Sequence, residues 1–247
     1  MTGEKVYFDE AAARRYDETS AEMYDPAVLD PTVDLLADLA GEHGSALELG
    51  VGTGRVALPL RRRVARVHGI DLSAPMIDQL LRKPGADRVG TTVGDCATTR
   101  VDGPFDLVYI VWNTLMNLTT QDDQVACFRN AAAHLRDGGC FVVDVMVPEL
   151  QRLPVGERVL PFLVSPHRLG FDEYDVVEQG LVSHHYWVDG EESRSVSMPF
   201  RYVWPAELDL MARIAGMSLA ARWSSWHREP FTSESRRHVS VWRKEAG

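Results

Sequence analysis

Short apolar segments alternate with amphipathic segments along residues 30–146. Five apolar segments have the length of buried strands: Ala46–Leu49, Ala65–Ile70, Arg88–Val93, Pro104–Val111 and Cys140–Met146. The segment Pro104–Val111 is apolar at nearly every position, which is typical of a strand buried on both faces. Because helical periodicity fills the stretches between these segments, we expect right-handed crossovers and a parallel, doubly wound sheet.

Capping residues predict where the helices of this half begin and end. Asp30 is placed as an N-cap with Pro31 in the first helical position, and Ser73 precedes the next helix. Thr120 opens a third helix through a capping box, and Gly138-Gly139 is expected to end it.

The pattern changes after Pro148. Residues 149–204 alternate polar and apolar positions without a long helix, and Asp189-Gly190 is typical of a hairpin turn between Leu181–Val188 and Glu192–Val203. We therefore expect a small antiparallel sheet inserted into the α/β body.

The last part of the chain returns to the main body. Pro205 opens a helix that Gly216 closes, and two strands follow at Leu219–Ser225 and His238–Trp242. Because only a short loop joins these strands, we expect them to pair antiparallel. The predicted fold class is thus α/β, with a doubly wound, mostly parallel seven-stranded sheet and a small antiparallel β insertion, in a single domain spanning residues 1–247.

Composition and charge narrow the possible partners. The formal net charge is −10 and the sequence pI is near 5.3, which argues against nucleic acid and against an anionic membrane surface. The one basic run, Arg61–Arg63, is explained by a solvated helix end. No apolar run has the length of a membrane span, and Met1–Glu10 lacks the apolar centre of a signal peptide, so we expect a cytoplasmic protein. The three cysteines have no metal-ligand spacing, and no metal is expected.

A glycine-rich turn follows the first apolar strand. Gly50, Gly52 and Gly54 follow a G-x-G-x-G spacing, and Arg55 stands where a dinucleotide fingerprint would have its third glycine. No Lys-Ser/Thr pair follows, as a phosphate-binding P-loop would require. Glu48 ends the strand, and a carboxylate at this position would repel a pyrophosphate but suit a cationic ligand.

These residues resemble the first motif, E/D-x-G-x-G-x-G, of the class I S-adenosylmethionine-dependent methyltransferases. The resemblance implies a Rossmann-like methyltransferase fold and S-adenosyl-L-methionine as cofactor, with S-adenosyl-L-homocysteine as product. It also implies that Glu48, the three glycines and Arg55 contact this cofactor.

Acids also end the second and third predicted strands. Asp71 can accept hydrogen bonds from two ribose hydroxyls, although taken alone it equally suits a helix cap. Asp95 can accept from the adenine amino group while the amide of Cys96 donates to a ring nitrogen. Leu72 and Met76 can supply apolar faces for adenine or belong to the core. An acid at each of three strand ends is similar to the pattern of the methyltransferase class.

The chemistry of methyl transfer is less clearly marked. Trp112 and Asn113 follow the fourth strand, which we expect beside the first strand and so next to the reactive end of the cofactor. Trp112 can line the cofactor pocket or pack in the core, and Asn113 can orient a nucleophile or cap a turn. His184 and His185 point to opposite faces of one strand, and His185 is selected with Asn113 as a catalytic candidate.

The wider plan resembles small-molecule methyltransferases such as the glycine and amino-sugar N-methyltransferases. That likeness implies a helical lid at residues 1–44, with a helical stretch from Tyr7 to Tyr24, and an inserted β subdomain at residues 149–204 over the active site. It also implies that Tyr16 lies near the methionine end of the cofactor.

The function expected from these features is methyl transfer to a nitrogen or oxygen of a small molecule, by a monomer or a homodimer. Two alternatives remain open at this point: an NAD-dependent oxidoreductase and a non-catalytic S-adenosylmethionine-binding protein. A nucleic-acid methyltransferase is disfavoured by the acidic composition and by the lack of an Asn-Pro-Pro-Tyr-type motif.

Overall fold

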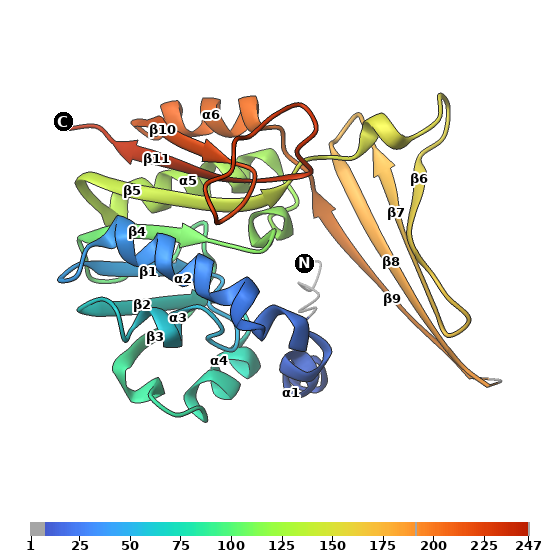
Figure 1. Cartoon of the computed structure of the whole chain (residues 1–247), viewed down its shortest axis with the longest axis horizontal. Helices are drawn as coiled ribbons and strands as arrows, with labels where there is room; N and C mark the ends of the chain where they lie inside the picture. Colours follow the sequence, from blue (N-terminus) through green and yellow to red (C-terminus); the bar gives the residue numbers. More distant parts are fainter. Residues whose placement is uncertain (1–7, 191, 247) are drawn as a thin grey trace.

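The computed structural model describes residues 8–190 and 192–246, which form a seven-stranded sheet and a separate four-stranded sheet (Figure 1). The strands of the larger sheet are β1 (Ser45–Leu49), β2 (Arg66–Asp71), β3 (Val89–Val93), β4 (Phe105–Ile110), β5 (Leu135–Met146), β10 (Met217–Trp223) and β11 (Arg237–Lys244). Their order is β10-β11-β5-β4-β1-β2-β3, with β1 to β5 parallel and β11 antiparallel to both of its neighbours. The predicted fold class is confirmed.

Helices cover both faces of this sheet. Buried residues of α2 (Pro26–Ala40), α3 (Ala57–Leu60) and α4 (Ala74–Leu81) form a core on one face. Buried residues of α5 (Gln121–His134) and α6 (Pro205–Ile214) form the core on the other face. Trp242 of β11 is fully buried there, and its ring lies 5.4 Å from that of Phe128. Among the described residues, no helix combines the length and the apolar character needed to cross a membrane.

The smaller sheet is an insertion between β5 and α6. Its strands are β6 (Val159–Val164), β7 (Arg168–Asp175), β8 (Gly180–Asp189) and β9 (Glu192–Arg201), paired antiparallel in sequence order. A 3₁₀ turn, η4 (Leu150–Arg152), precedes them. Because the insertion leaves from the end of β5, it stands beyond the carboxyl ends of the parallel strands (Figure 1). An inserted antiparallel sheet was predicted, and this part of the prediction is confirmed.

The chain before β1 differs from the predicted helices. Residues 7–24 were predicted as helical; α1 runs Glu10–Thr19, a 3₁₀ turn, η1, follows at Ala21–Tyr24, and Tyr7 lies outside the described residues. The next helix, α2, starts at Pro26 and not at Pro31. Asp25 caps it by accepting from the amide of Ala27 at 2.9 Å, so the predicted cap at Asp30 was wrong. The sequence offers two Asp-Pro pairs, and the helix uses the earlier one.

The glycines Gly138-Gly139 were also misplaced by the sequence argument. Helix α5 ends at His134, and both glycines belong to β5. Gly138 has φ +75, and the pairing of β4 with β5 shifts register between Phe105 and Leu107. The two glycines therefore lie at an irregularity of the strand, where glycine is favoured as strongly as after a helix.

Remaining 3₁₀ turns join these elements. They are η2 (Ala86–Arg88), before β3, and η3 (Thr114–Asn117), after β4. The closing strands β10 and β11 pair antiparallel as expected.

Candidate active site

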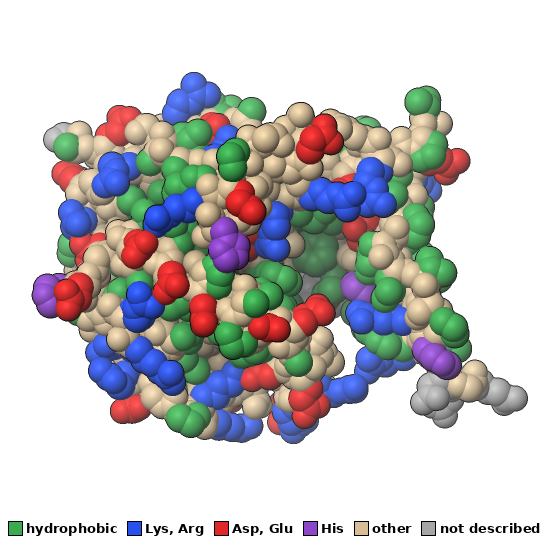
Figure 2. Space-filling model, viewed as in Figure 1, with side chains coloured by type: hydrophobic (Ala, Val, Ile, Leu, Met, Phe, Trp, Pro, Cys, Tyr) green, Lys and Arg blue, Asp and Glu red, His purple; other side chains and the backbone are tan. Residues whose placement is uncertain are grey.

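The strand order brings the predicted site residues to one edge of the sheet. β1 lies between β4 and β2, and β3 is next to β2, so the loops after all four strands meet at their carboxyl ends. The inserted sheet and α1 stand at the same edge (Figure 1). Figure 2 shows a hollow between the main body and the insertion, with hydrophobic side chains in its depth and charged side chains along its rim.

The glycine loop, residues 50–54, needs glycine for both conformation and space. Gly50, Gly52 and Gly54 have φ of +79, +53 and +82, which L side chains rarely adopt. A Cβ on Gly50 would lie 2.4 Å from Cγ2 of Thr114, and one on Gly54 would lie 2.8 Å from Cγ of Leu80. The loop is therefore packed tightly against η3 and α4.

The helix after this loop is shorter than the sequence suggested. It was expected to continue to Arg61–Arg63 and to turn its amides toward the ligand. Helix α3 begins only at Ala57 and has four residues, after which Arg61 bonds to the carbonyl oxygens of Val64 and Arg88. Pro59 inside this turn cannot donate a helical hydrogen bond. Neither a helix N-terminus nor the amides of the three loop glycines are open toward a ligand, because these amides donate to Ile70, Asp71 and Val51.

Asp71 connects the second strand to the glycine loop. One carboxylate oxygen accepts from the amide of Gly52 at 2.7 Å, and the other accepts from the amide of Ser73 at 2.8 Å. Burial raises the pKa of Asp71, and these two hydrogen bonds oppose the rise. Each oxygen keeps a further lone pair, so the carboxylate can still accept from two hydroxyl groups of a ligand.

Glu48 does not present an open carboxylate. It is 2% exposed, and the hydroxyl of Tyr109 on β4 donates to it at 2.9 Å. Burial raises the pKa of Glu48 to about 8, while Tyr109 and the guanidinium of Arg55 oppose the rise. At neutral pH this acid holds its proton, and a cation nearby would favour its release.

A compact turn follows the end of β3. One oxygen of the Asp95 carboxylate accepts from the amide of Ala97 at 2.7 Å, and the carbonyl of Cys96 accepts from Asn130 at 2.7 Å. Leu72 is 50% exposed at the same edge, whereas Met76 is buried beneath the glycine loop. Leu72 is thus open to a ligand, and Met76 is mainly part of the packing under the loop.

The first helix is tied to the glycine loop by a polar network. Asp17 accepts from the hydroxyls of Tyr24 and Thr53, both at 2.6 Å, and pairs with the ammonium of Lys83 at 2.5 Å. Tyr16, which immediately precedes Asp17 in α1, is largely buried, and burial raises its pKa. Arg55 and Asp71 both act on that pKa, which places the phenol of Tyr16 near the loop and the β2 end.

Trp112 and Asn113 form a strained turn after β4. Both are left-handed, with φ of 56 and 62, a conformation that costs non-glycine residues on the order of 1–3 kcal/mol each. The carboxamide oxygen of Asn113 accepts from the amide of Met146 at 2.7 Å. The guanidinium of Arg55 lies 5.4 Å from the centre of the Trp112 ring. Asn113 therefore already links the ends of β4 and β5, and its oxygen is engaged.

His185 lies on the inserted sheet, away from the glycine loop in sequence. Its Nε2 is 3.2 Å from the hydroxyl of Ser183, and its ring packs against Phe162 and Trp187 with centroids 5.3 and 5.9 Å away. Burial lowers the pKa of His185, and the nearby Arg168 lowers it further, so the ring is neutral at pH 7. His185 lies on the same face of β8 as Leu181, and Leu181 is part of the main hydrophobic core. This face of β8 is therefore turned toward the seven-stranded sheet and its helices.

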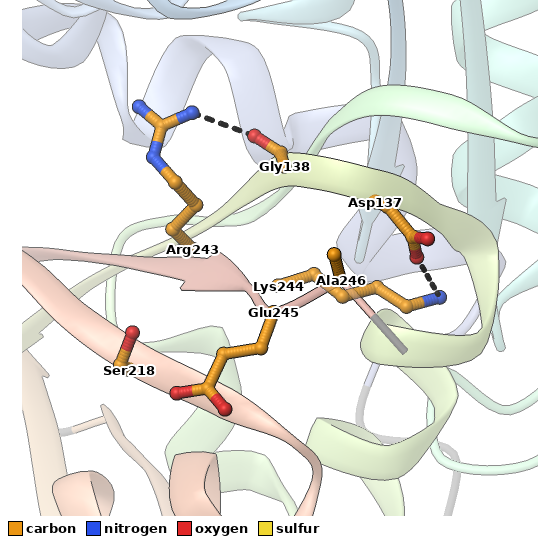
Figure 3. Close-up of a pocket in the computed structure, with 7 residues that line it drawn as sticks. All are labelled: Asp137, Gly138, Ser218, Arg243, Lys244, Glu245 and Ala246. Atoms are coloured by element: carbon orange, nitrogen blue, oxygen red, sulfur yellow. Dashed lines mark hydrogen bonds and ion pairs between the residues drawn. The ribbon is translucent and has the colours of Figure 1, made fainter.

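A shallow surface pocket lies in another part of the molecule (Figure 3). It has a volume of about 510 Å³ and lies where β5 begins and β11 ends. Arg243 donates to the carbonyl of Gly138 at 2.6 Å there, and Lys244 lies 4.0 Å from the carboxylate of Asp137. This is the amino edge of the parallel strands, so the pocket contains none of the predicted site residues.

Comparison with known proteins agrees with this geometry. The family described as "Methyltransferase domain" matches residues 46–139. The cypemycin N-terminal methyltransferase of a Streptomyces species is 31% identical over 92% of this chain and 96% of its own length. The chain belongs to the S-adenosylmethionine-dependent methyltransferases.

Two solved structures extend the comparison. The CcbJ methyltransferase of Streptomyces caelestis is 35% identical, with a TM-score of 0.80 over 92% of this methyltransferase and 96% of the other chain. CalS10, an amino pentose methyltransferase of Micromonospora echinaspora solved with bound S-adenosylmethionine, shares the fold, with 23% identity, a TM-score of 0.71 and coverage of 98% and 99%.

S-adenosylmethionine is the cofactor of this methyltransferase, and the described residues fit it. Asp71 has lone pairs left for hydroxyl groups, Leu72 is exposed beside it, and no lysine follows the glycine loop to hold a phosphate. The alternatives of an NAD-dependent oxidoreductase and of a non-catalytic binding protein were therefore wrong.

Sequence reasoning missed several residues at this edge. Asp17 and Thr53 connect α1 to the loop, and neither had a motif that would have identified it. Asp144 and Arg237 meet beside the Trp112 turn, with the Arg237 guanidinium 2.8 Å from the carboxylate. Asp144 did have a signal, because it is the one charged residue within the apolar strand segment Cys140–Met146.

Proposed function

We propose that this methyltransferase transfers the methyl group to an amine of a small molecule. The observation that carries the proposal is the end-to-end similarity to the cypemycin N-terminal methyltransferase, whose name places the acceptor at an N-terminus. The fold of the amino pentose methyltransferase CalS10 is compatible with a further amine acceptor, but at its identity it supports the fold alone.

Different parts of the cofactor would be held at the ends of three strands. Asp71 would hold the ribose hydroxyls, and Asp95 with the amide of Cys96 would hold the adenine beside Leu72. The loop glycines would lie against the methionine portion. Each of these groups already has its orientation fixed by a backbone hydrogen bond or a tight contact, so little ordering remains at binding.

The charged end of the cofactor would lie between Glu48, Arg55 and Tyr16. Arg55 can pair with the cofactor's carboxylate, and the ammonium group would favour the ionised form of Glu48. Tyr16 would close this end from the α1 side. When bound, the cofactor supplies an activated methyl group on its sulfonium.

The acceptor would enter through the hollow between the main body and the insertion (Figure 2). A neutral amine needs only to be held in line with the methyl group, because its lone pair is the nucleophile. The neutral ring of His185 can take the proton that the methylated amine releases, whereas a strong base, which a hydroxyl acceptor would need, is not among the candidates. Residues 149–204 would thus form the roof of the acceptor site. Of the lid expected at residues 1–44, α1 and the turn after it would close over the cofactor, because α2 packs in the core against the sheet.

Transfer of tritium from methyl-labelled S-adenosylmethionine tests the proposal. The acceptors are a short peptide with a free N-terminus and its N-acetylated twin, and an amino sugar and its hydroxyl analogue. Label on the free amines and none on their matched controls is expected. Label on the hydroxyl analogue alone, or no label on any amine although S-adenosylhomocysteine binds, would contradict it.

A further inference from the structure

The turn formed by Trp112 and Asn113, the β4 turn, has an unusual backbone at the reactive edge of the sheet. Two consecutive non-glycine residues have positive φ, 56 and 62. Such a pair persists only where the surrounding structure over-determines it, and such places cluster at functional sites. The question is which side chains hold it.

Asp144 of β5 forms hydrogen bonds with both residues of the turn. Its carboxylate accepts from the amide of Trp112 at 3.1 Å, and its carbonyl oxygen accepts from the amide of Asn113 at 3.1 Å. One residue thus takes both amides of the turn. Its side chain is 1% exposed, so the carboxylate needs a compensating cation to remain charged in this position.

Arg237 provides that cation from the far end of the sequence. It is the first residue of β11, and one terminal nitrogen lies 2.8 and 3.0 Å from the two carboxylate oxygens of Asp144. Its guanidinium also lies 5.2 Å from the centre of the Trp112 ring. Arg237 therefore contacts both the group that fixes the backbone of the turn and the aromatic ring that the turn presents.

The β4 turn and the residue after it contact the glycine loop directly. Thr114, which follows the turn, packs so closely on Gly50 that a Cβ there would lie 2.4 Å from its methyl group. Arg55 of the loop contacts the Trp112 ring from 5.4 Å. The turn consequently stands between the methionine end of the cofactor site and the hollow through which an acceptor would arrive.

We propose that Arg237 is a positioning residue for methyl transfer, acting through Asp144 on the β4 turn. The proposal rests on the proposed function for its kinetic part. Arg237 pairs with the carboxylate of Asp144, Asp144 keeps the turn left-handed, and the turn holds Trp112 where it aligns the acceptor. The ribose and adenine contacts lie on β2 and β3, so the loss of Arg237 should disturb transfer and leave cofactor affinity in place.

The test compares Arg237→Ala with Arg237→Lys and with the matched control Arg236→Ala. Arg236 is the preceding residue, its side chain is 74% exposed, and its nearest acid, Glu149, is 3.7 Å away. Three quantities are measured for each: affinity for S-adenosylhomocysteine by calorimetry, kcat for the amine that wild type methylates, and the ¹⁹F spectrum of protein containing 5-fluorotryptophan. The Trp112 signal is assigned with Trp112→Phe.

For Arg237→Ala we expect unchanged S-adenosylhomocysteine affinity, a displaced Trp112 signal and a kcat lower by up to about 100-fold, since small misplacements of reacting groups have costs of this size. Arg237→Lys should lie between, because it keeps the charge but not the planar fork. Added guanidinium ion should restore part of the kcat of Arg237→Ala. Arg236→Ala should match wild type in all three measurements.

An unchanged Trp112 signal in Arg237→Ala would overturn the proposal, and so would losses of cofactor affinity and kcat in equal proportion. These outcomes differ from a failure of the proposed function. In that case wild type binds S-adenosylhomocysteine but methylates none of the amines, and the ¹⁹F comparison still decides whether Arg237 holds the turn.

Discussion

Hydrogen bonds to the neighbouring strand β2 hold the glycine loop of residues 50–54, whereas the inserted sheet adds stacked aromatic side chains to an antiparallel backbone ladder. Gly52 donates to Asp71 at 2.7 Å, and Gly50 and Val51 donate to the carbonyl of Ile70 at 2.8 and 3.0 Å. On the insertion, β8 pairs with β7 and β9, and Phe171 stacks on His184 with centroids 4.8 Å apart. The positive φ of the loop glycines restricts which residues can stand there, whereas the extended backbone of the insertion does not.

Surface exposure separates the two regions in the same way. Exposed large hydrophobic residues are frequent on the insertion: Val155, Val159, Phe162, Val164, Leu169, Val176, Val177, Val188 and Val196. At the cofactor edge the exposed hydrophobic residues include Leu72 and Val93. The exposed large hydrophobic residues are thus concentrated on the insertion and are few at the edge where the glycine loop lies.

The largest expected effect is that of Gly50→Ala. The new Cβ would lie 2.4 Å from Thr114 in a residue at φ +79, so the loop must move and binding of S-adenosylhomocysteine should become undetectable by calorimetry. Gly41→Ala is the matched control, because its φ is +80 and no atom lies within 4 Å of the new Cβ. That control should lose about 1–3 kcal/mol of stability, because Gly41 has ψ 158 as well as positive φ, and it should keep binding. Equal binding by both variants would contradict the claim that close packing of the loop shapes the cofactor site.

Asp71→Ala should come next in size. Losing two hydrogen bonds to a charged acceptor corresponds to roughly 2–4 kcal/mol, or about one to three decades in S-adenosylhomocysteine affinity. The bonds to Gly52 and Ser73 add a cost of about 1–3 kcal/mol in unfolding free energy. Asp71→Asn, which keeps the shape, should lose less of both. Normal affinity in the folded fraction of Asp71→Ala would show that Asp71 is only structural.

A third prediction concerns pH and Glu48. The pKa of Glu48 is raised from an ordinary 4.5 to about 8, so between these values the cofactor-free folded state holds a proton that the unfolded chain has released. This contribution to stability is fully present below about pH 4.5 and is lost as pH rises through about 8. Thermal unfolding of Glu48→Gln against wild type measures it: the difference in melting temperature should change in favour of the variant as pH rises. A pH-independent difference would mean that Glu48 is ionised in the folded protein.

The smallest effects on binding are expected for the insertion. Alanine at His185 and Trp187 should lower amine methylation by about tenfold, the scale at which general acid–base groups begin to matter, with unchanged S-adenosylhomocysteine affinity. The matched pair is His184 and Tyr186 on the opposite face of β8. If both pairs leave turnover intact, or if activity falls only with folding, the insertion is structural and the acceptor enters elsewhere.

The contrast between the two regions also explains what could be predicted from the sequence. Gly50, Asp71 and the alternating elements have local causes, positive φ and strand periodicity, that a sequence displays directly. Burial raises the pKa of Glu48, and the Tyr109 hydroxyl that opposes the rise is 61 positions away, so only the pairing of β1 with β4 brings the two side chains together. The contact of Asp144 with Arg237 spans 93 positions and had no sequence signal on the arginine side.

Local rules failed where two signals of equal strength were present. Asp25-Pro26 and Asp30-Pro31 both suit a helix start, and the helix uses the first, where the Asp25 side chain accepts from the amide of Ala27. The sequence showed the alternation of β8 but not which histidine faces the body, because either register is compatible with a strand that is apolar on both sides.

The position of β11 has a consequence for how the molecule is made. β11 is the last strand in the sequence, yet it lies between β5 and β10 and brings Arg237 to the buried carboxylate of Asp144. During synthesis from the N-terminus, the cofactor loop and its neighbouring strands emerge long before this partner does. The turn after β4 therefore gains its contact with Arg237 only when the strand that is synthesised last has docked between β5 and β10. The part of the chain made last thus completes an edge whose other strands were made first.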